Sequence, residues 1–452
     1  MSGGGRRRRA PLPRLRAPLP RRHAPLPRPV RWAFYVSALV AFVGVVSLRG
    51  GASWVDARSL TLPTTALAQG HFHRAAELNA LPQPLGYPLL VSPIVAGLPA
   101  VRAGTWCTDD QSVPNFKIVR EVWPACSDNY YQVPVRPPWY RSQGALGVLA
   151  WIVLAAGVVQ LLRALGMGRG LAEAGVVLGL AALPAASDGV VQAFHPQDFF
   201  SVGLSAAALA SVLRRRWVAA GVLFGVAFAC KQFALLALLP ALAAAPGWRE
   251  RARLGLPAAA TVGVMTLPFF VLAPWATVHS LIAVARFAGG WTTNTVVGMS
   301  HVSELTKLLV ARDGPIALAL VLVVVARWRV GERLLEPVPL LGLTAACLGG
   351  RLVFEVLNTS YYLLAVSVML VALDVAARRV PYRSVAWIVL MRLWINPLAG
   401  HEPSWTDSVL YLGGALVAVA LGLEALTRRS ARAPVPTVAV PALSAVSAGS
   451  TA

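Results

Sequence analysis

The chain has 452 residues, of which 56% are hydrophobic and only 13% are charged, and its mean hydropathy is +0.62. This composition excludes a water-soluble globular protein and indicates an integral membrane protein. The formal charge of +22 is carried almost entirely by arginine, since Lys117, Lys231 and Lys307 are the only lysines. No nucleic-acid-binding motif accompanies this charge, so it does not indicate a nucleic-acid partner.

The N-terminal residues 1–30 are rich in arginine and proline and cannot bury apolar area. We predict that they form a disordered cytoplasmic tail. The apolar run from Trp32 to Leu48 follows a tail that is too long for a signal peptide and lacks a cleavage site, so it is predicted to be an uncleaved signal anchor. A second disordered cytoplasmic tail is predicted over 427–452.

Hydropathy predicts an all-α polytopic membrane domain over 31–426, with about twelve transmembrane helices and both termini in the cytoplasm. The predicted spans are 31–48, 144–162, 171–186, 198–213, 217–230, 232–246, 254–273, 315–328, 336–350, 361–377, 384–396 and 407–426. Of the 41 Lys and Arg residues, 27 then lie on the cytoplasmic side, as the positive-inside rule requires. Every histidine except His23 lies on the other side, which suggests chemistry at the extracytoplasmic face.

The first predicted extracytoplasmic loop, 49–143, is long enough to hold structure of its own. Its segment 59–68 is moderately amphipathic, and prolines interrupt the apolar run 85–100, so amphipathic helices lying on the membrane surface are expected here. Cys107 and Cys126 lie in an oxidising compartment and predict a disulfide. Cys230 and Cys347 lie within predicted spans and are expected to be inert.

A second long extracytoplasmic loop is predicted over 274–314. Its centre, "GGWTTNTVVGMSHVSELTK", indicates irregular backbone, with His301 and Glu304 close together. From spacing alone, an exposed or helix-capping residue is the favoured interpretation of His301. The shorter outer turn "FHPQD" holds His195 and Asp198, which either cap the next helix or line a cavity.

The apolar run 217–246 is divided at Lys231 and Gln232, because an undivided helix would invert the charge pattern of every later loop. Each half is then about 21 Å long at 1.5 Å per residue, too short to cross roughly 30 Å of hydrocarbon. Lys231 is therefore predicted on the floor of a cavity. A lysine at this depth costs about 2.5 to 3.5 kcal/mol and either snorkels to the surface or binds an anion such as a lipid phosphate.

Several sequence elements share the outer face in a characteristic order: "WVDARS" with Asp56, then "GYPLL", "FHPQD", "RRRWVAAGVLFGVAFACKQFALLALLP" and finally "RLVFEVLNTSYYLLAVSVMLVAL". This order resembles that of the GT-C superfamily, and most closely the actinobacterial glycosyltransferase family 87. That family includes polyprenyl-phosphomannose-dependent mannosyltransferases of glycolipid biosynthesis. The resemblance covers most of residues 31–426. It rests on the order and the shared side of these elements, because no single motif is specific.

The resemblance implies a multi-pass enzyme of the plasma membrane, a hexosyltransferase. It would move a sugar, most simply mannose, from a polyprenyl-phosphate donor to a hydroxyl of a glycolipid or cell-envelope glycan on the extracytoplasmic face, with inversion. Asp56 matches the acid of the first loop in the family and is the expected general base, although Asp before "ARSL" also suits a helix N-cap. His301 resembles an outer-loop histidine of the family and would position the acceptor or share its proton.

The donor phosphate is expected to bind to Lys231 and Arg351, with further substrate contacts from His195, Asp198, Gln232, Tyr361 and Tyr362. Arg351 is alternatively a helix-surface partner of Glu355, four residues on. The tyrosines are alternatively interfacial-belt residues.

Metal-independent chemistry is favoured, and a divalent cation is not excluded. His71 and His73 with His195 or Asp198 make only a weak metal pattern. Three alternative hypotheses about the function are a twelve-span secondary transporter, an arabinofuranosyltransferase of the same superfamily, and a non-catalytic membrane scaffold. The sequence does not identify the sugar or the acceptor.

Overall fold

The computed structural model describes residues 25–49, 60, 63–64, 66–77, 79, 84–96, 137–191, 194–275, 277–278, 295–298, 300–356, 360–395 and 405–427. Within these ranges the chain is helical, with short 3-10 turns and no strand. Asp56, Cys107 and Cys126 lie outside the described residues, and their roles remain predictions.

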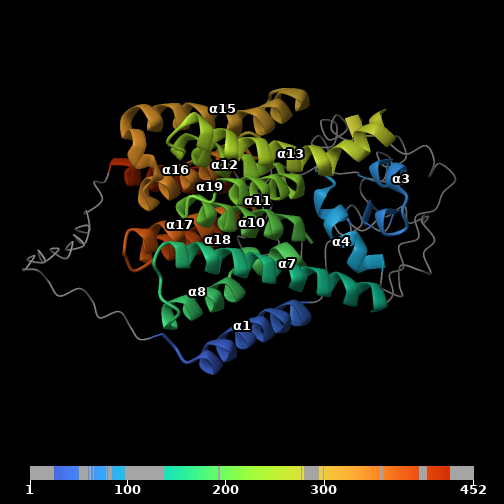
Figure 1. Ribbon diagram of the computed structural model, residues 1–452, viewed down its shortest axis with the longest axis horizontal. Helices are drawn as coiled ribbons and strands as arrows, with labels where there is room; N and C mark the ends of the chain where they lie inside the picture. The colour runs from blue at the N-terminus through green and yellow to red at the C-terminus, as the bar shows by residue number, and fades with distance from the viewer. Residues whose placement is uncertain are drawn as a thin grey trace, which may run out of the picture.

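The helices follow one another with short connections over most of the chain. Their bounds are α1 (Arg28–Arg49), α3 (Phe72–Glu77), α4 (Gly86–Ala96), α7 (Pro137–Ala164), α8 (Leu171–Ala182), α9 (Pro184–Val191), α10 (Pro196–Leu213), α11 (Trp217–Cys230), η2 (Gln232–Ala234), α12 (Leu235–Ala244), α13 (Trp248–Leu272), α15 (Glu304–Val330), η4 (Gly331–Leu335), α16 (Pro337–Phe354), η5 (Ser360–Tyr362), α17 (Leu363–Ala376), α18 (Tyr382–Ile395) and α19 (Trp405–Thr427). Each apolar segment predicted from hydropathy overlaps one of these helices or a consecutive pair. Figure 1 shows the longer helices packed side by side, with α3 and α4 near one end.

Six stretches of the described helices are long and apolar enough to cross a membrane: Arg28–Val45, Ala145–Ala164, Trp248–Leu272, Leu309–Leu335, Pro337–Phe354 and Trp405–Thr427. Several others, among them α11 and α17, are apolar but shorter. Because helices satisfy their own backbone hydrogen bonds, bundles of this kind are one of the two architectures that can span a bilayer. The fold is that of an all-α membrane protein.

Two features of the surface fit a lipid environment. On α13, Val264, Leu267 and Val271 are more than half exposed, and such an apolar helix face is stable only against lipid or another protein. Exposed tryptophans mark both ends of this helix, with Trp248 at its start and Trp275 just beyond its end. Indole rings favour the two membrane interfaces, and the 25 residues of α13 cover about 37 Å.

Glycines bring several helices into close backbone contact. A Cβ on Gly203 of α10 would lie 2.6 Å from the carbonyl oxygen of Val153 on α7. A Cβ on Gly422 of α19 would lie 2.4 Å from the carbonyl oxygen of Gly342 on α16. Such contacts leave no room for a larger residue, as is common where membrane helices associate through small side chains.

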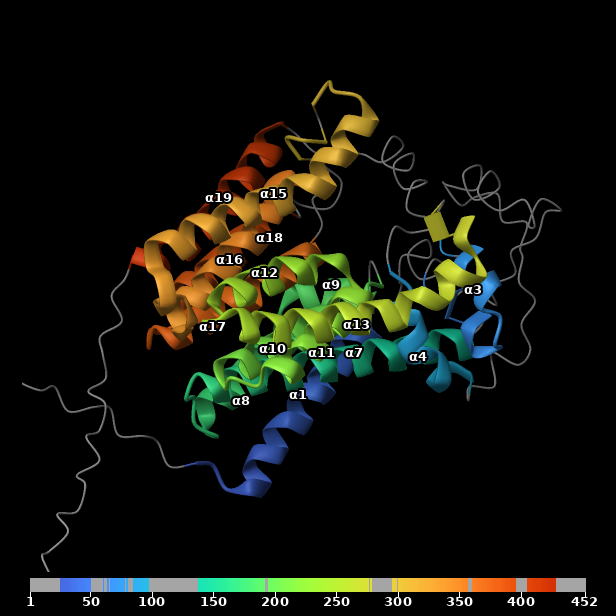
Figure 2. The ribbon, with the colours of Figure 1, turned by 45° about the horizontal axis from the view of Figure 1, so that its top comes forward.

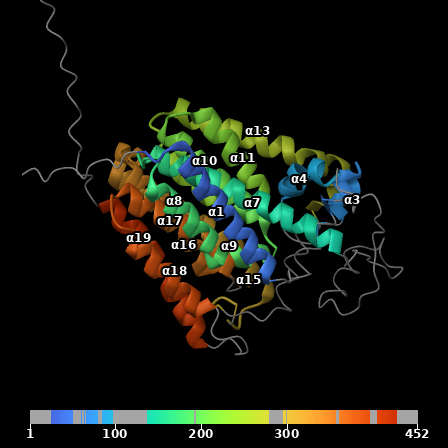
Figure 3. The same cartoon turned by 90° about the horizontal axis from the view of Figure 1, so that it is seen from below.

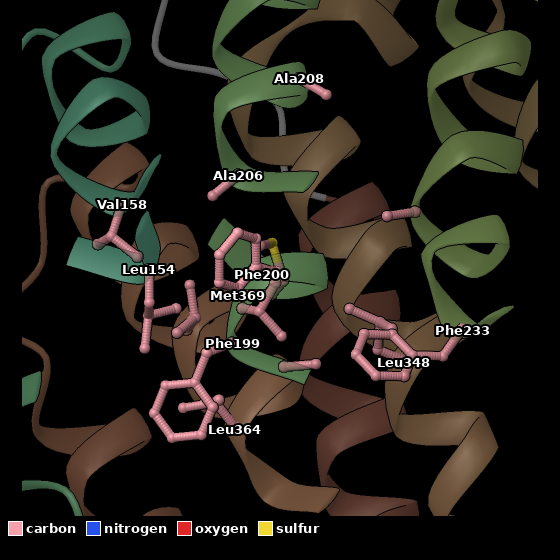
Figure 4. Packing of buried hydrophobic residues seen from close by; sticks show 14 of the residues in the cluster. Leu154, Val158, Phe199, Phe200, Ala206, Ala208, Phe233, Leu348, Leu364 and Met369 are labelled. Atoms are coloured by element: carbon pink, nitrogen blue, oxygen red, sulfur yellow. The ribbon is translucent and has the colours of Figure 1, made fainter. Parts of the chain in front are cut away.

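Larger apolar side chains fill the remaining space. Leu154 of α7, Phe199 of α10, and Leu364 and Met369 of α17 are buried in one continuous core (Figure 4). Phe199 directly follows Asp198, which lies in the first turn of α10.

One end of the bundle is rich in arginine. The connection between α10 and α11 holds Arg214, Arg215 and Arg216, and Arg214 donates to the carbonyl oxygen of Gln160 near the end of α7. Arg163 at this end forms two hydrogen bonds of 2.9 Å with the buried carboxylate of Glu173. We call this end the arginine-rich end. Figure 2 and Figure 3 show the same helices from two other directions, with α1 beside α8.

The structure moves two predicted boundaries. Helix α15 begins at Glu304, well before the span predicted at 315, because Ser303 caps it by accepting from the Thr306 amide at 3.2 Å. Helix α7 begins at Pro137, before the predicted residue 144. The run 85–100 contains the 11-residue helix α4 despite Pro93, and at about 17 Å this helix is too short to cross a bilayer.

Candidate functional site

The chain breaks at Lys231, where the sequence predicts a division between two helices. Helix α11 ends at Cys230, Lys231 is extended, with φ −158° and ψ 129°, and η2 begins at Gln232. The Lys231 side chain is 15% exposed. The break therefore places the Lys231 ammonium group in a largely buried position, at the end of the bundle opposite the arginine-rich end.

The nearest charge to Lys231 belongs to Asp198, in the first turn of α10. Its carboxylate is buried, and its Oδ1 lies 3.5 Å from Lys231 Nζ. No hydrogen bond reaches this Oδ1 from any described group. The pair is thus held by charge attraction alone, and the N–H groups of the Lys231 ammonium donate no hydrogen bond to Asp198.

His195 directly precedes α10 and is also buried. Its Nδ1 accepts a hydrogen bond of 2.8 Å from Nε2 of Gln197 and lies 3.9 Å from Oδ2 of Asp198. An Nδ1 that accepts a hydrogen bond leaves the proton of a neutral imidazole on Nε2. Gln197 is therefore a direct hydrogen-bond partner of the His195 ring.

The two tyrosines of η5 join this histidine. The rings of His195 and Tyr361 are stacked, with centroids 4.1 Å apart and an angle of 17°. Tyr362 meets Tyr361 edge to face at 4.6 Å. Both tyrosines therefore lie in the site and are not belt residues facing lipid.

Arg351, in the last turn of α16, is enclosed by aromatic rings. Its guanidinium carbon lies 4.8 Å from the centre of the Phe233 ring and 4.6 Å from that of Tyr362. Its Nε lies 2.5 Å from Oε1 of Glu355, and both side chains are less than 15% exposed. The pairing of Arg351 with Glu355 considered from the sequence is therefore confirmed, but the pair is largely buried instead of lying on the surface, because rings from two other elements cover Arg351.

The two ion pairs influence each other. Arg351 interacts electrostatically with Asp198, and Glu355 with Lys231. Burial raises the pKa of the Glu355 carboxyl, and the charge of Arg351 acts in the opposite direction. We call these residues the polar cluster: His195, Gln197, Asp198, Lys231, Arg351, Glu355, Tyr361 and Tyr362.

Segments from the two long loops pack beside the cluster. The start of α4 approaches the end of α11 so closely that a Cβ on Gly86 would lie 2.3 Å from the carbonyl oxygen of Ala229. Tyr87 is buried against Phe200 of α10, with ring centres 5.3 Å apart. From the other loop, the Thr295 hydroxyl is 2.6 Å from the Glu355 carbonyl oxygen. These described parts of the two loops are therefore anchored next to the cluster.

Two of the predicted residues are less directly involved. Gln232 is exposed at the start of η2, next to Lys231. His301 is exposed, and the structure shows no hydrogen bond or ion pair between it and the described residues of the polar cluster. It does not cap α15 either, since that role falls to Ser303.

The metal pattern considered from the sequence is not assembled in the described ranges. His71 and His73 are exposed near α3, whereas His195 is buried beside α10. No group of three or more metal-ligating side chains occurs among the residues with described positions.

Sequence reasoning did not assign four contributors. Glu355 was expected only as a possible ion-pair partner of Arg351, four residues before it, and Gln197 only lies between the predicted site residues His195 and Asp198. Phe233 lies in an apolar run, so the sequence predicts only that it is buried. Asp188, whose carboxylate accepts a hydrogen bond from Ser360 just before the tyrosines, gave no sign of such a contact because the two lie 172 residues apart.

Comparison with known proteins adds no family assignment: no protein-family model, no curated protein and no solved structure matches the chain.

Proposed function

We propose that the protein is a membrane-embedded glycosyltransferase that transfers a sugar, mannose as the first candidate, from a polyprenyl-phosphate donor to a hydroxyl of a glycolipid or cell-envelope glycan. The observation that carries the proposal is the state of Lys231. Its ammonium group is largely buried and faces a carboxylate at 3.5 Å without a hydrogen bond. An anion with several acceptor oxygens would use the N–H donors that Asp198 leaves open, and phosphate is such an anion.

Arg351 has a different part in this proposal. Its guanidinium is held by Glu355 and by the rings of Phe233 and Tyr362, so it contributes a fixed positive charge near the phosphate and no direct grip on it. Pre-oriented charges of this kind stabilise a departing phosphate without reorganising during the reaction.

The proposed topology has twelve crossing segments: α1, α7, α8 with α9, α10, α11, η2 with α12, α13, α15, α16, η5 with α17, α18 and α19. The arginine-rich end is cytoplasmic in this topology, by the positive-inside rule, and the polar cluster faces the extracytoplasmic side of the plasma membrane. A lipid-linked donor would then present its phosphate to the cluster from the outer membrane surface.

The proposed reaction is a single displacement at the anomeric carbon. The bond between the anomeric carbon and the phosphate oxygen breaks, and its electron pair leaves with the polyprenyl phosphate. The acceptor hydroxyl oxygen bonds to the anomeric carbon from the opposite face, and its proton passes to the carboxylate of Asp56. Inversion at the anomeric carbon is expected, and no metal takes part in the proposed reaction. His301 stays a candidate for positioning the acceptor.

A secondary transporter is the second candidate, because paired charges at a break between two helices also occur in transporters. The cluster argues for the enzyme, since its charged groups gather at one end of α10, α11 and α16 instead of the middle. An arabinofuranosyltransferase would use the same site with a different sugar.

The test uses the full chain in lipid nanodiscs, incubated with synthetic polyprenyl-phosphate mannose, the arabinofuranose donor and membrane glycolipids. Transfer by the wild type, and its loss by about ten- to a hundredfold in Lys231→Met, would support the proposal. Lys307→Met is the matched control, because Lys307 is also buried but lies in α15 outside the cluster. Absence of transfer from either donor, with solute uptake by reconstituted vesicles, would favour the transporter.

A further inference from the structure

Asp188, on α9, is a buried carboxylate outside the set of residues predicted from the sequence. It is 1% exposed. Its Oδ2 accepts a hydrogen bond of 2.8 Å from the Ser360 hydroxyl and lies 3.1 Å from Nη1 of Arg392 on α18. Charge-assisted contacts of this kind are stronger than neutral ones, so Asp188 ties α9 to η5 and α18.

Gly189, the residue after Asp188, contacts His195 and Tyr361. The carbonyl oxygen of Gly189 accepts a hydrogen bond of 2.6 Å from the backbone amide of His195. A Cβ on Gly189 would lie 3.3 Å from the Cβ of Tyr361, so the tyrosine rests directly on this glycine. Gly189 thus contacts both residues of the His195–Tyr361 stack. Asp188 holds Ser360, the residue directly before Tyr361.

We infer that Asp188 is a positioning residue, which fixes Tyr361 against His195 by holding Ser360 and Arg392. Ser360 is the residue immediately before Tyr361, so a shift of the one-turn helix η5 moves the ring. Burying a carboxylate lowers the stability of the fold because the charge loses its hydration. The pairing with Arg392 offsets this loss only while both charges are present. Removing the charge of Asp188 therefore loosens η5 and exposes His195.

The expected effect on sugar transfer rests on the proposed function. The contact between Asp188 and Ser360 does not, because it is measurable without a substrate. If the cluster binds the donor, loosening Tyr361 lowers the affinity for the donor. If the cluster has another function, the change in His195 still occurs.

The experiment measures how fast diethyl pyrocarbonate modifies each histidine in the full chain, by mass spectrometry of the protein in nanodiscs. His195 is protected in the wild type, whereas His71 and His301 are exposed and serve as internal references. Asp188→Asn and Ser360→Ala should each raise the rate at His195 about three- to tenfold, the range expected when an aromatic contact is loosened. The rates at His71 and His301 should not change.

Asp374→Asn and Ser384→Ala are matched controls. Ser384 donates a hydrogen bond of 2.9 Å to the buried Asp374, at the opposite end of α17. These variants should lower thermal stability to a similar extent and leave His195 protected. The inference fails if His195 stays protected in both Asp188→Asn and Ser360→Ala, or if the controls expose it equally. Transfer activity, measured in parallel, reports separately on the proposed function.

Discussion

Lys231 and Asp198 form a largely buried ion pair, with Nζ and Oδ1 3.5 Å apart, between the end of α11 and the first turn of α10. Removing one partner of such a pair leaves the other charge buried and uncompensated, which is more costly than removing both. We therefore expect Lys231→Met alone to lower the free energy of unfolding by about 3 kcal/mol. Adding Asp198→Asn should recover most of the loss.

Unfolding in mixed micelles of mild detergent and sodium dodecyl sulfate provides the measurement for this pair. The single variants, the double variant and the wild type form a double-mutant cycle. Strict additivity of the two single effects would show that Lys231 and Asp198 do not interact, and would contradict the pairing.

Gly422 lies where α19 crosses α16. We expect Gly422→Ala to lower stability by about 1 to 3 kcal/mol, because the added Cβ would meet the carbonyl oxygen of Gly342 at 2.4 Å and backbone cannot move aside cheaply. Gly413→Ala, on the same helix, is the control. No atom lies within 4 Å of its Cβ, so alanine should be neutral or stabilise the helix by about 0.5 to 1 kcal/mol. The same unfolding assay compares them, and equal effects would contradict the close helix packing.

Asp56 is the proposed general base. Asp56→Asn keeps the size of the side chain but cannot accept the proton, so the rate of transfer should fall by about 10² to 10⁴-fold while expression and donor binding are kept. Single-turnover transfer from a radiolabelled donor measures this rate. Asp313→Asn, at an exposed position whose partner among the described residues is the adjacent Arg312, should have no effect. Full transfer by Asp56→Asn would remove Asp56 from the mechanism.

The helices could be predicted from the sequence because hydropathy and arginine-rich turns are local signals. The break at Lys231 was predictable for the same reason, since it follows from the alternation of charge along the chain. The environment of Arg351 was not predictable in this way. Its covering rings, Phe233 and Tyr362, come from η2 and η5, and only the packing of these elements distinguishes a buried ion pair from a surface one.

The start of α15 was missed for a different reason. The segment from 304 to 314 contains charged and polar residues, which lower its hydropathy although they favour a helix. The cap at Ser303 is the signal that identifies this start, because Ser at an N-cap accepts from the first-turn amides. Asp188 gave no local signal at all, since its partners come from η5 and α18.

The central claim is that Lys231 recognises the phosphate of a lipid-linked sugar donor. It is tested most directly by comparing the binding of polyprenyl phosphate and of polyprenol of equal chain length to the full chain in nanodiscs. The Lys231→Met/Asp198→Asn variant, which keeps the site neutral, controls for folding. The account predicts that the wild type prefers the phosphate by about tenfold or more and that the double variant loses this preference. Equal binding of both lipids to the wild type, or an unchanged preference in the double variant, would contradict it.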